Sequence, residues 1–205
     1  MSVMPMFPLG TVLVPHQPLP LHVFEPRYRA MVHDCLAGDR IFGVVLIERG
    51  HEVGGGDVRF DIGCTAEIVQ AEETEDGRWG LGTIGRRPLR VLEWLPDDPY
   101  PRAEVEVAPE EAWSDDAEAA FAEAHAAMVR VVALAEQAGL TVDRRVLELP
   151  GEASWDAWLL VARAPIGDLD RLGLLGAEGP AVRLRRLAAH VEDVCAVLAS
   201  RLGGG

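Results

Sequence analysis

The residues that could do chemistry by themselves are few and widely spaced. The cysteines, Cys35, Cys64 and Cys195, include no C-x-x-C pair, and the six histidines form no H-x-H or H-E-x-x-H pair. Zinc sites use such spacings, so we expect no metal site and no cofactor. None of the four serines lies in a G-x-S-x-G motif. A Cys–His pair stays open on spacing alone, but no cysteine has a recognisable nucleophile context, so we expect no enzyme and no catalytic residue.

The charged residues narrow the function classes further. All 19 basic residues are arginine, and without lysine the chain has no Walker A phosphate loop, Ser–Lys dyad or lysine Schiff base. The net charge is −14; residues 1–110 carry 18 acidic and ten basic side chains, and residues 111–205 carry 15 and nine. Neither part is a basic module, so the charge argues against a nucleic-acid partner.

One glycine motif matches the dinucleotide-binding fingerprint only in its letters. The segment 80–85 reads GLGTIG, which fits G-x-G-x-x-G. That fingerprint must follow a strand and open a helix. Pro88 lies where the helix would continue, and a strand-like stretch follows it. The motif therefore indicates a glycine-rich strand with a bulge.

The pattern of elements changes near residue 110. Before it we predict short strands and one helix that begins at Pro26 and ends before Gly38. The strands are expected at 6–15 (an edge strand or two short strands), 21–24, 41–47, 58–68, 79–84, 89–94 and 103–107, with a flexible glycine loop at 54–56. After residue 110 the spacing predicts helices, with Ser114 and Ser154 as N-caps and Pro180 opening the last one. We expect an α+β chain with a β-rich lobe, 1–110, and a helical lobe, 111–205.

The block at residues 19–32, LPLHVFEPRYRAMV, is the most distinctive. An extended stretch leads into a helix opened by Pro26, and Glu25 lies near the positive end of that helix. Arg27 and Arg29 could form ion pairs with Glu25 or with neighbouring carboxylates. One interpretation is a strand-to-helix corner held by such an ion pair and without a binding role.

This block resembles the opening signature of the N-terminal, substrate-binding domain of Lon proteases. The resemblance continues through FGVVLI at 42–47, IGCTAEI at 62–68, DGR at 76–78 and TIGRRPLRV at 83–91, and more loosely through the helical part. It implies a PUA-like β-barrel followed by a helical lobe. The ATPase and protease domains of full Lon proteases are not in this sequence, so the chain resembles a stand-alone recognition domain.

The resemblance leads us to expect a non-catalytic protein- or peptide-binding module, linked to proteolysis or protein quality control. Its partners would be unfolded proteins or peptides, or a partner protease or chaperone. We place the binding surface in the groove between the lobes. Its candidate residues are His22, Phe24, Glu25, Arg27, Tyr28, Arg87, Trp155 and Trp158. Trp155 and Trp158, three apart on one helix, could instead be core residues.

Two other functions stay open at this stage. PUA-like barrels resemble RNA-binding modules, but fold analogy is weak evidence and the charge opposes it. The inter-lobe groove could also bind or hydrolyse a small molecule, although no sequence feature favours this. With no basic residue before Arg27 and no apolar run of about 20 residues, we expect a cytoplasmic protein without a membrane segment. The sequence carries no signal for an oligomeric state.

Overall fold

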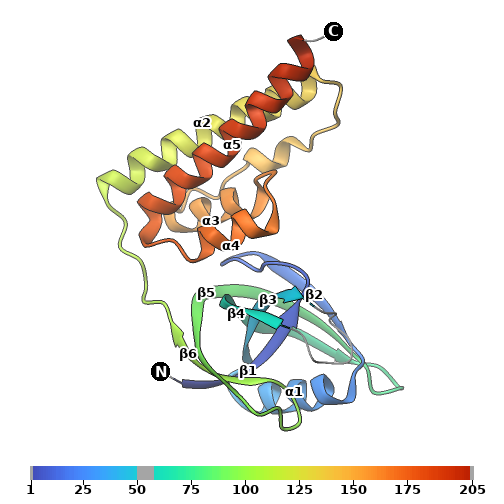
Figure 1. The fold of residues 1–205 in the computed structure, drawn as a ribbon. Helices are drawn as coiled ribbons and strands as arrows, with labels where there is room; N and C mark the ends of the chain where they lie inside the picture. The colour runs from blue at the N-terminus through green and yellow to red at the C-terminus, as the bar shows by residue number, and fades with distance from the viewer. Residues whose placement is uncertain (1, 50–57, 204–205) are drawn as a thin grey trace. The chain divides into compact units, whose positions relative to one another are not determined.

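The first unit of the chain, Met1–Glu110, is a small barrel in the computed structural model, which describes residues 2–49 and 58–203. Its elements are β1 (Ser2–Leu9), β2 (Pro18–Val23), α1 (Pro26–Ala37), β3 (Ile41–Arg49), β4 (Val58–Glu73), β5 (Trp79–Leu95) and β6 (Arg102–Val107). The sheet order is β2-β5-β4-β3-β1-β6, and an additional β5–β6 pairing closes a ring of five strands (Figure 1). Within the described parts of the chain, β2 pairs with β5 alone and lies outside that ring.

The sequence predicted an edge strand or two short strands at 6–15. The structure instead has one strand, β1 at Ser2–Leu9, which contains two prolines and lies between β3 and β6 in the sheet order. Its first half, up to Pro5, pairs antiparallel with β6, and its second half, which contains Pro8, pairs parallel with β3. Each half therefore has a neighbour on one side only. Proline lacks an N–H and is tolerated in a strand where no ladder hydrogen bond is needed. This split pairing explains how an interior strand can hold both.

The two strands predicted at 79–84 and 89–94 are one continuous strand, β5, and the predicted bulge lies within it. Cys64 is opposite Pro88 and Ala66 is opposite Gly85, so two residues of β5 face the single Thr65. The buried Thr65 hydroxyl accepts a hydrogen bond from the Arg87 N–H at 3.0 Å and donates one to the Arg87 carbonyl at 3.2 Å. The side chain thus satisfies backbone groups that the bulge removes from the ladder.

The barrel is filled by side chains that alternate along the strands. Inward-facing residues of four strands form one buried cluster: Met6, Val45, Leu89, Val91, Ala103 and Val105. Helix α1 adds its apolar face, on which Tyr28 and Met31 are buried. The cluster residues of β5 and β6 lie two apart in the chain, as expected for strands with one face in a core.

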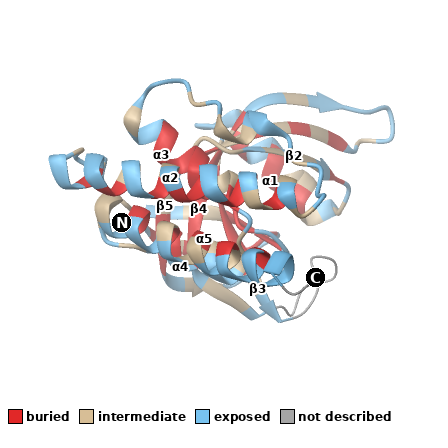
Figure 2. Cartoon of the chain, turned by 90° about the horizontal axis from the view of Figure 1, so that it is seen from above, coloured by how far each residue is buried: buried red, intermediate tan, exposed pale blue. Residues whose placement is uncertain are grey.

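The second unit, Glu111–Gly205, is helical. It consists of α2 (Asp115–Gln137), the 3-10 helix η1 (Arg144–Leu147), α3 (Ala153–Arg163), α4 (Asp168–Leu175) and α5 (Gly179–Gly203). Helices α2 and α5 run side by side in the same direction (Figure 1), which brings Arg130 to Glu192 and Arg185 to Asp116. Buried and exposed residues alternate along α5, as expected for a helix with one face in a core (Figure 2).

The two predicted N-caps have different outcomes. The Ser114 hydroxyl accepts a hydrogen bond from the Ala117 N–H at 3.2 Å, which confirms this residue as the cap of α2. Ser154 is not a cap, because α3 begins at Ala153 with Glu152 before it. Instead, the Asp156 carboxylate accepts from the Gly151 N–H at 3.0 Å and so closes the turn that precedes the helix.

The structure confirms the predicted α+β class, with a β-rich part before a helical part. The glycine loop predicted at 54–56 lies outside the described residues. Among the helices described, none is long and apolar enough to cross a membrane.

Candidate functional site

The corner between β2 and α1 carries most of the predicted site residues. Burial alternates along β2 and ends with the buried Val23, so His22 and Phe24 on either side of it are exposed. The Phe24 side chain is 47% exposed, which is high for a large apolar residue. Glu25 then occupies the N-cap position of α1, and Pro26 fixes the first helical residue. Phe24 therefore lies in the turn between β2 and α1, with its side chain exposed.

An ion pair holds this corner, as one interpretation of the sequence expected. The Arg27 Nε lies 3.2 Å from the Glu25 carboxylate, and the Arg27 guanidinium lies 4.5 Å from the centroid of the Tyr28 ring. Tyr28 itself is buried, with its ring centroid 4.2 Å from that of Phe7 in β1. The Tyr28 ring is therefore part of the barrel core, while Phe24 and His22 face outward.

A charged hairpin lies beside this corner. A shallow hollow of about 670 Å³ is lined by His22, Arg78 and residues 72–76, which form the end of β4 and the start of the β4–β5 connection. The Thr74 hydroxyl donates to Asp76 at 2.6 Å, and this hydrogen bond lowers the pKa of the Asp76 carboxyl. Gly77 has φ +74°, and a side chain there would collide with the Arg29 guanidinium from α1. Helix α1 therefore packs closely against the hairpin at Gly77, where the Arg29 side chain takes the space that a Cβ would need.

Arg87 does not join the corner. Its backbone lies at the β5 bulge, and its Nη2 donates to the Ala108 carbonyl after β6. None of the hydrogen bonds described for it reaches the β2–α1 residues. The Arg87 side chain therefore links β5 to the segment after β6.

The two predicted tryptophans, both in α3 of the helical unit, lie in different surroundings. Trp158 is buried, with the Arg183 guanidinium 3.7 Å from the centroid of its ring. Trp155 is 38% exposed. Only Trp155 therefore presents part of its ring to solvent.

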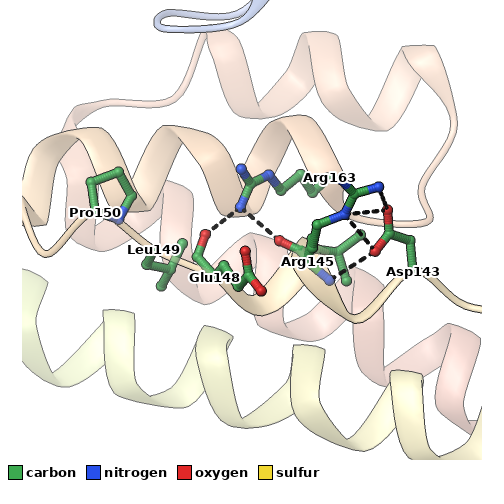
Figure 3. A pocket seen from close by; sticks show the side chains of 7 residues that line it. Asp143, Arg145, Glu148, Leu149, Pro150 and Arg163 are labelled. Atoms are coloured by element: carbon green, nitrogen blue, oxygen red, sulfur yellow. Dashed lines mark hydrogen bonds and ion pairs between the residues drawn. The ribbon is translucent and has the colours of Figure 1, made fainter.

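Two adjoining hollows in the helical unit have no counterpart in the sequence prediction. One is a polar groove of about 600 Å³ lined by Asp143, Arg145, Val146, Glu148, Leu149, Pro150 and Arg163 (Figure 3). The other is an apolar pocket of about 220 Å³, which shares Val146 and Arg163 with the groove. The groove is lined by residues between 143 and 163, and the pocket by residues between 128 and 198. The apolar residues of both follow the same spacing as core residues. No local sequence signal distinguishes them.

The cysteines are not prepared for nucleophilic chemistry. Burial raises the pKa of both Cys35 and Cys64 to about 12, and it also raises the pKa of Cys195. The thiolate is the reactive form, so at neutral pH these groups are held as thiols. In the described part of the chain, no group of three or more His, Cys, Asp or Glu residues could hold a metal ion.

Comparison with known proteins supports a single family. The family model described as the ATP-dependent protease La (LON) substrate-binding domain matches residues 3–193. The chain is 32% identical over 110 residues to Lon protease of Dictyoglomus thermophilum, covering 53% of this chain and 14% of that protein. It is 28% identical over 200 residues to Lon protease 2 of Herpetosiphon aurantiacus, covering 95% of this chain and 24% of that protein. It thus spans a quarter or less of these relatives.

A solved structure agrees with this assignment. The crystal structure of a Lon N-terminal domain protein from Xanthomonas campestris has a TM-score of 0.65 and 27% identity, and covers 92% of this chain and 98% of its own. The resemblance noted in the sequence is therefore confirmed. The match to the family model spans the barrel and most of the helical unit, and the chain belongs to the Lon substrate-binding domain family.

Proposed function

We propose that this chain binds segments of unfolded protein or peptide as a non-catalytic recognition module linked to proteolysis. One observation carries the proposal: the match to a substrate-binding domain extends from residue 3 to residue 193. Both units of the chain thus belong to the recognition domain. We further propose that it acts in the cytoplasm beside a separate protease or chaperone; its three free, buried cysteines are compatible with a reducing compartment.

The β2–α1 corner supports this proposal as one contact surface. We assign the contact to Phe24, with His22, Glu25 and Arg27 as its polar surroundings. Exposed aromatic and arginine side chains supply much of the energy in protein interfaces. Tyr28 is buried in the barrel core, and the exposed Arg87 donates its side-chain hydrogen bond to the Ala108 carbonyl, so neither is part of the proposed surface.

The neighbouring edge of β2 favours recognition by side chains over strand addition. Among the described residues, β2 pairs with β5 alone, and because prolines cannot donate, this ladder takes its N–H groups from Leu19, Leu21 and Val23. Pro18 and Pro20 are then left on the open edge, where they offer carbonyl acceptors but no N–H donors. A client strand cannot form a full ladder there. The exposed Phe24 ring is a better anchor for a client.

The test is fluorescence anisotropy of a labelled, reduced and carboxymethylated lactalbumin titrated with the full chain, beside a labelled single-stranded RNA. We expect saturable binding of the unfolded protein, no binding of its native form, and no binding of the RNA at moderate salt. Binding of neither probe would contradict the proposal. Binding of the RNA alone, with a steep dependence on salt, would favour the nucleic-acid alternative instead.

A further inference from the structure

The apolar pocket of the helical unit has a buried floor and an open rim. Its lining comes from α2, the segment after it, η1, the end of α3 and α5. The lining residues are Met128, Val131, Val132, Ala135, Leu140, Val142, Val146, Arg163, Pro165, Val194 and Leu198. Met128, Val131 and Val132 are buried, whereas Leu140 at the rim is 55% exposed. The pocket is thus open to solvent through an apolar mouth.

The size of this pocket suits an apolar side chain. An apolar cavity of about 150 Å³ is large enough to hold benzene. The pocket measures about 220 Å³, so it can take a branched aliphatic or an aromatic group. Filling it would remove the exposed part of Leu140 and the valine side chains from water.

Arg163 is the one charged residue among those that line the pocket. Its Nη1 donates to the carbonyls of Glu148 and Arg145, at 2.6 and 3.3 Å, and these bonds fix the guanidinium in place (Figure 3). Among the described residues, no hydrogen-bond acceptor is recorded for its Nε or Nη2, and no carboxylate forms an ion pair with it. A preorganised guanidinium binds a carboxylate with a charge-assisted hydrogen bond.

The charged residues next to Arg163 have other partners or line the adjoining groove. Arg144 is paired with Glu136 and Arg145 with Asp143, each at 2.7 Å. The carboxylates of Asp143 and Glu148 line the adjoining polar groove and not the apolar pocket. Among the described residues, Arg163 therefore combines a place in an apolar lining with a guanidinium that no carboxylate neutralises, which suits a ligand that carries both an apolar group and a carboxylate.

We propose that this pocket binds the carboxyl-terminal residue of a client polypeptide, with an apolar side chain in the pocket and the terminal carboxylate on Arg163. This inference rests on the proposed function and names the part of the client that is recognised. In the last residue of a polypeptide, the carboxylate and the side chain are attached to the same Cα. The carboxylate can therefore reach Arg163 while the side chain enters the apolar pocket that Arg163 lines. An internal client residue offers only a neutral carbonyl to the same guanidinium.

The experiment uses labelled ten-residue peptides of glycine and serine that differ only at the end. One ends in Leu-Leu with a free carboxylate, the second ends in Leu-Leu-amide, and the third ends in Ser-Ser with a free carboxylate. Anisotropy with the full chain should show binding of the first peptide at least about tenfold tighter than of the other two. Equal binding of acid and amide would overturn the role of the carboxylate. Binding of octanoate, measured by calorimetry, without binding of the first peptide would overturn the polypeptide ligand.

Two pairs of variants place the binding in this pocket. Arg163→Gln should weaken the Leu-Leu acid about tenfold and leave the amide unchanged, whereas Arg201→Gln, which removes an equal charge elsewhere on the unit, should have no effect. Val194→Phe fills the pocket and should abolish binding, whereas Val197→Phe, on the same helix but outside the lining, should not. Equal effects within either pair would contradict the proposal. Thermal unfolding curves confirm that each variant is folded.

Failure of this inference can be separated from failure of the proposed function. If the unfolded lactalbumin binds but the Leu-Leu peptide does not, the recognition function stands and the carboxyl-terminal pocket is wrong. If neither binds, both proposals are wrong.

Discussion

Two arginines on α5, two residues apart, differ in what their charges contribute. Arg183 is fully buried; its Nη1 lies 2.8 Å from a Glu111 oxygen, its Nη2 donates to the other, and its Nε donates to the Leu174 carbonyl at 3.2 Å. It also stacks on Trp158. Arg185 forms an ion pair with Asp116, but both side chains are about half exposed. Because the Arg183–Glu111 pair is buried, removing one partner leaves the other charge without compensation and strongly destabilises the fold. The exposed Arg185–Asp116 pair contributes little to stability.

We therefore expect Arg183→Met to lower the free energy of unfolding by about 3 kcal/mol, because Glu111 keeps a poorly solvated charge without its partner. Arg183→Lys should recover little of this, since an ammonium cannot form the two-pronged pair and the stack together. Arg185→Met is the matched control and should cost less than about 1 kcal/mol. Urea unfolding monitored by circular dichroism measures all three. Similar losses for Arg183→Met and Arg185→Met would contradict this account.

Phe24 and Val69 provide a second comparison at the level of residues, because both side chains are 47% exposed in the first unit. Phe24→Ala should weaken binding of unfolded lactalbumin about five- to thirtyfold, as truncation of an interface anchor does, with little change in Tm. Val69→Ala should leave binding unchanged. The measurement is the anisotropy titration described above. An equal loss in both variants, or none in Phe24→Ala, would remove Phe24 from the proposed surface.

At the level of elements, the glycines of β5 mark where the barrel is tightly packed. A Cβ on Gly85 would collide with the backbone carbonyl of Val14. For Gly80 in the same strand, the nearest atom to such a Cβ is the Glu72 carbonyl oxygen, at 4.0 Å. The motif that matched a dinucleotide fingerprint therefore has a structural role at one of its glycines: it lets a loop cross close to the strand.

Gly85→Ala should lower the free energy of unfolding by about 1–3 kcal/mol, because backbone atoms cannot move aside as a side chain can. Gly80→Ala should change it by less than about 0.5 kcal/mol. Thermal and urea unfolding of the two variants, compared with the wild-type chain, tests the difference. If Gly80→Ala proved as damaging as Gly85→Ala, close backbone approach would not be the reason for the glycine.

The elements show what the sequence could and could not predict. Local sequence signals correctly located β3, β4, β6, α1 and α2, whereas the strand predicted at 6–15 is β1 at Ser2–Leu9 and the two predicted at 79–84 and 89–94 are the single strand β5. The pairing of β1 depends on distant segments. Its prolines indicated an edge strand, but the strand tolerates them because one half pairs with β6 and the other half with β3. Likewise, Phe24 and Tyr28 are both aromatic, and Tyr28 of α1 is buried where Phe7 of β1 packs on it. The apolar pocket depends on the fit of five segments, which no spacing encodes.

At the level of the whole molecule, the chain is divided by its cores. The barrel unit has its own buried cluster around Met6 and Val45, and the helical unit buries residues of α2, α3 and α5 among themselves. Domains with separate cores can unfold separately. We propose that Met1–Glu110 and Glu111–Gly205 are two cooperative units within one recognition domain, so a substitution in one core should leave the other protected.

Hydrogen exchange of the full chain tests this with two variants already introduced. Arg183→Met removes the buried pair of the helical unit and should speed amide exchange in α2, α3 and α5 while β3, β4 and β5 keep their protection. Gly85→Ala should do the reverse, because the carbonyl it displaces belongs to the barrel. If either variant lowered protection equally in both units, the chain would unfold as one. The proposed binding surfaces at Phe24 and at Arg163 would then be coupled through global stability, and variants of one could not be interpreted without measuring the other.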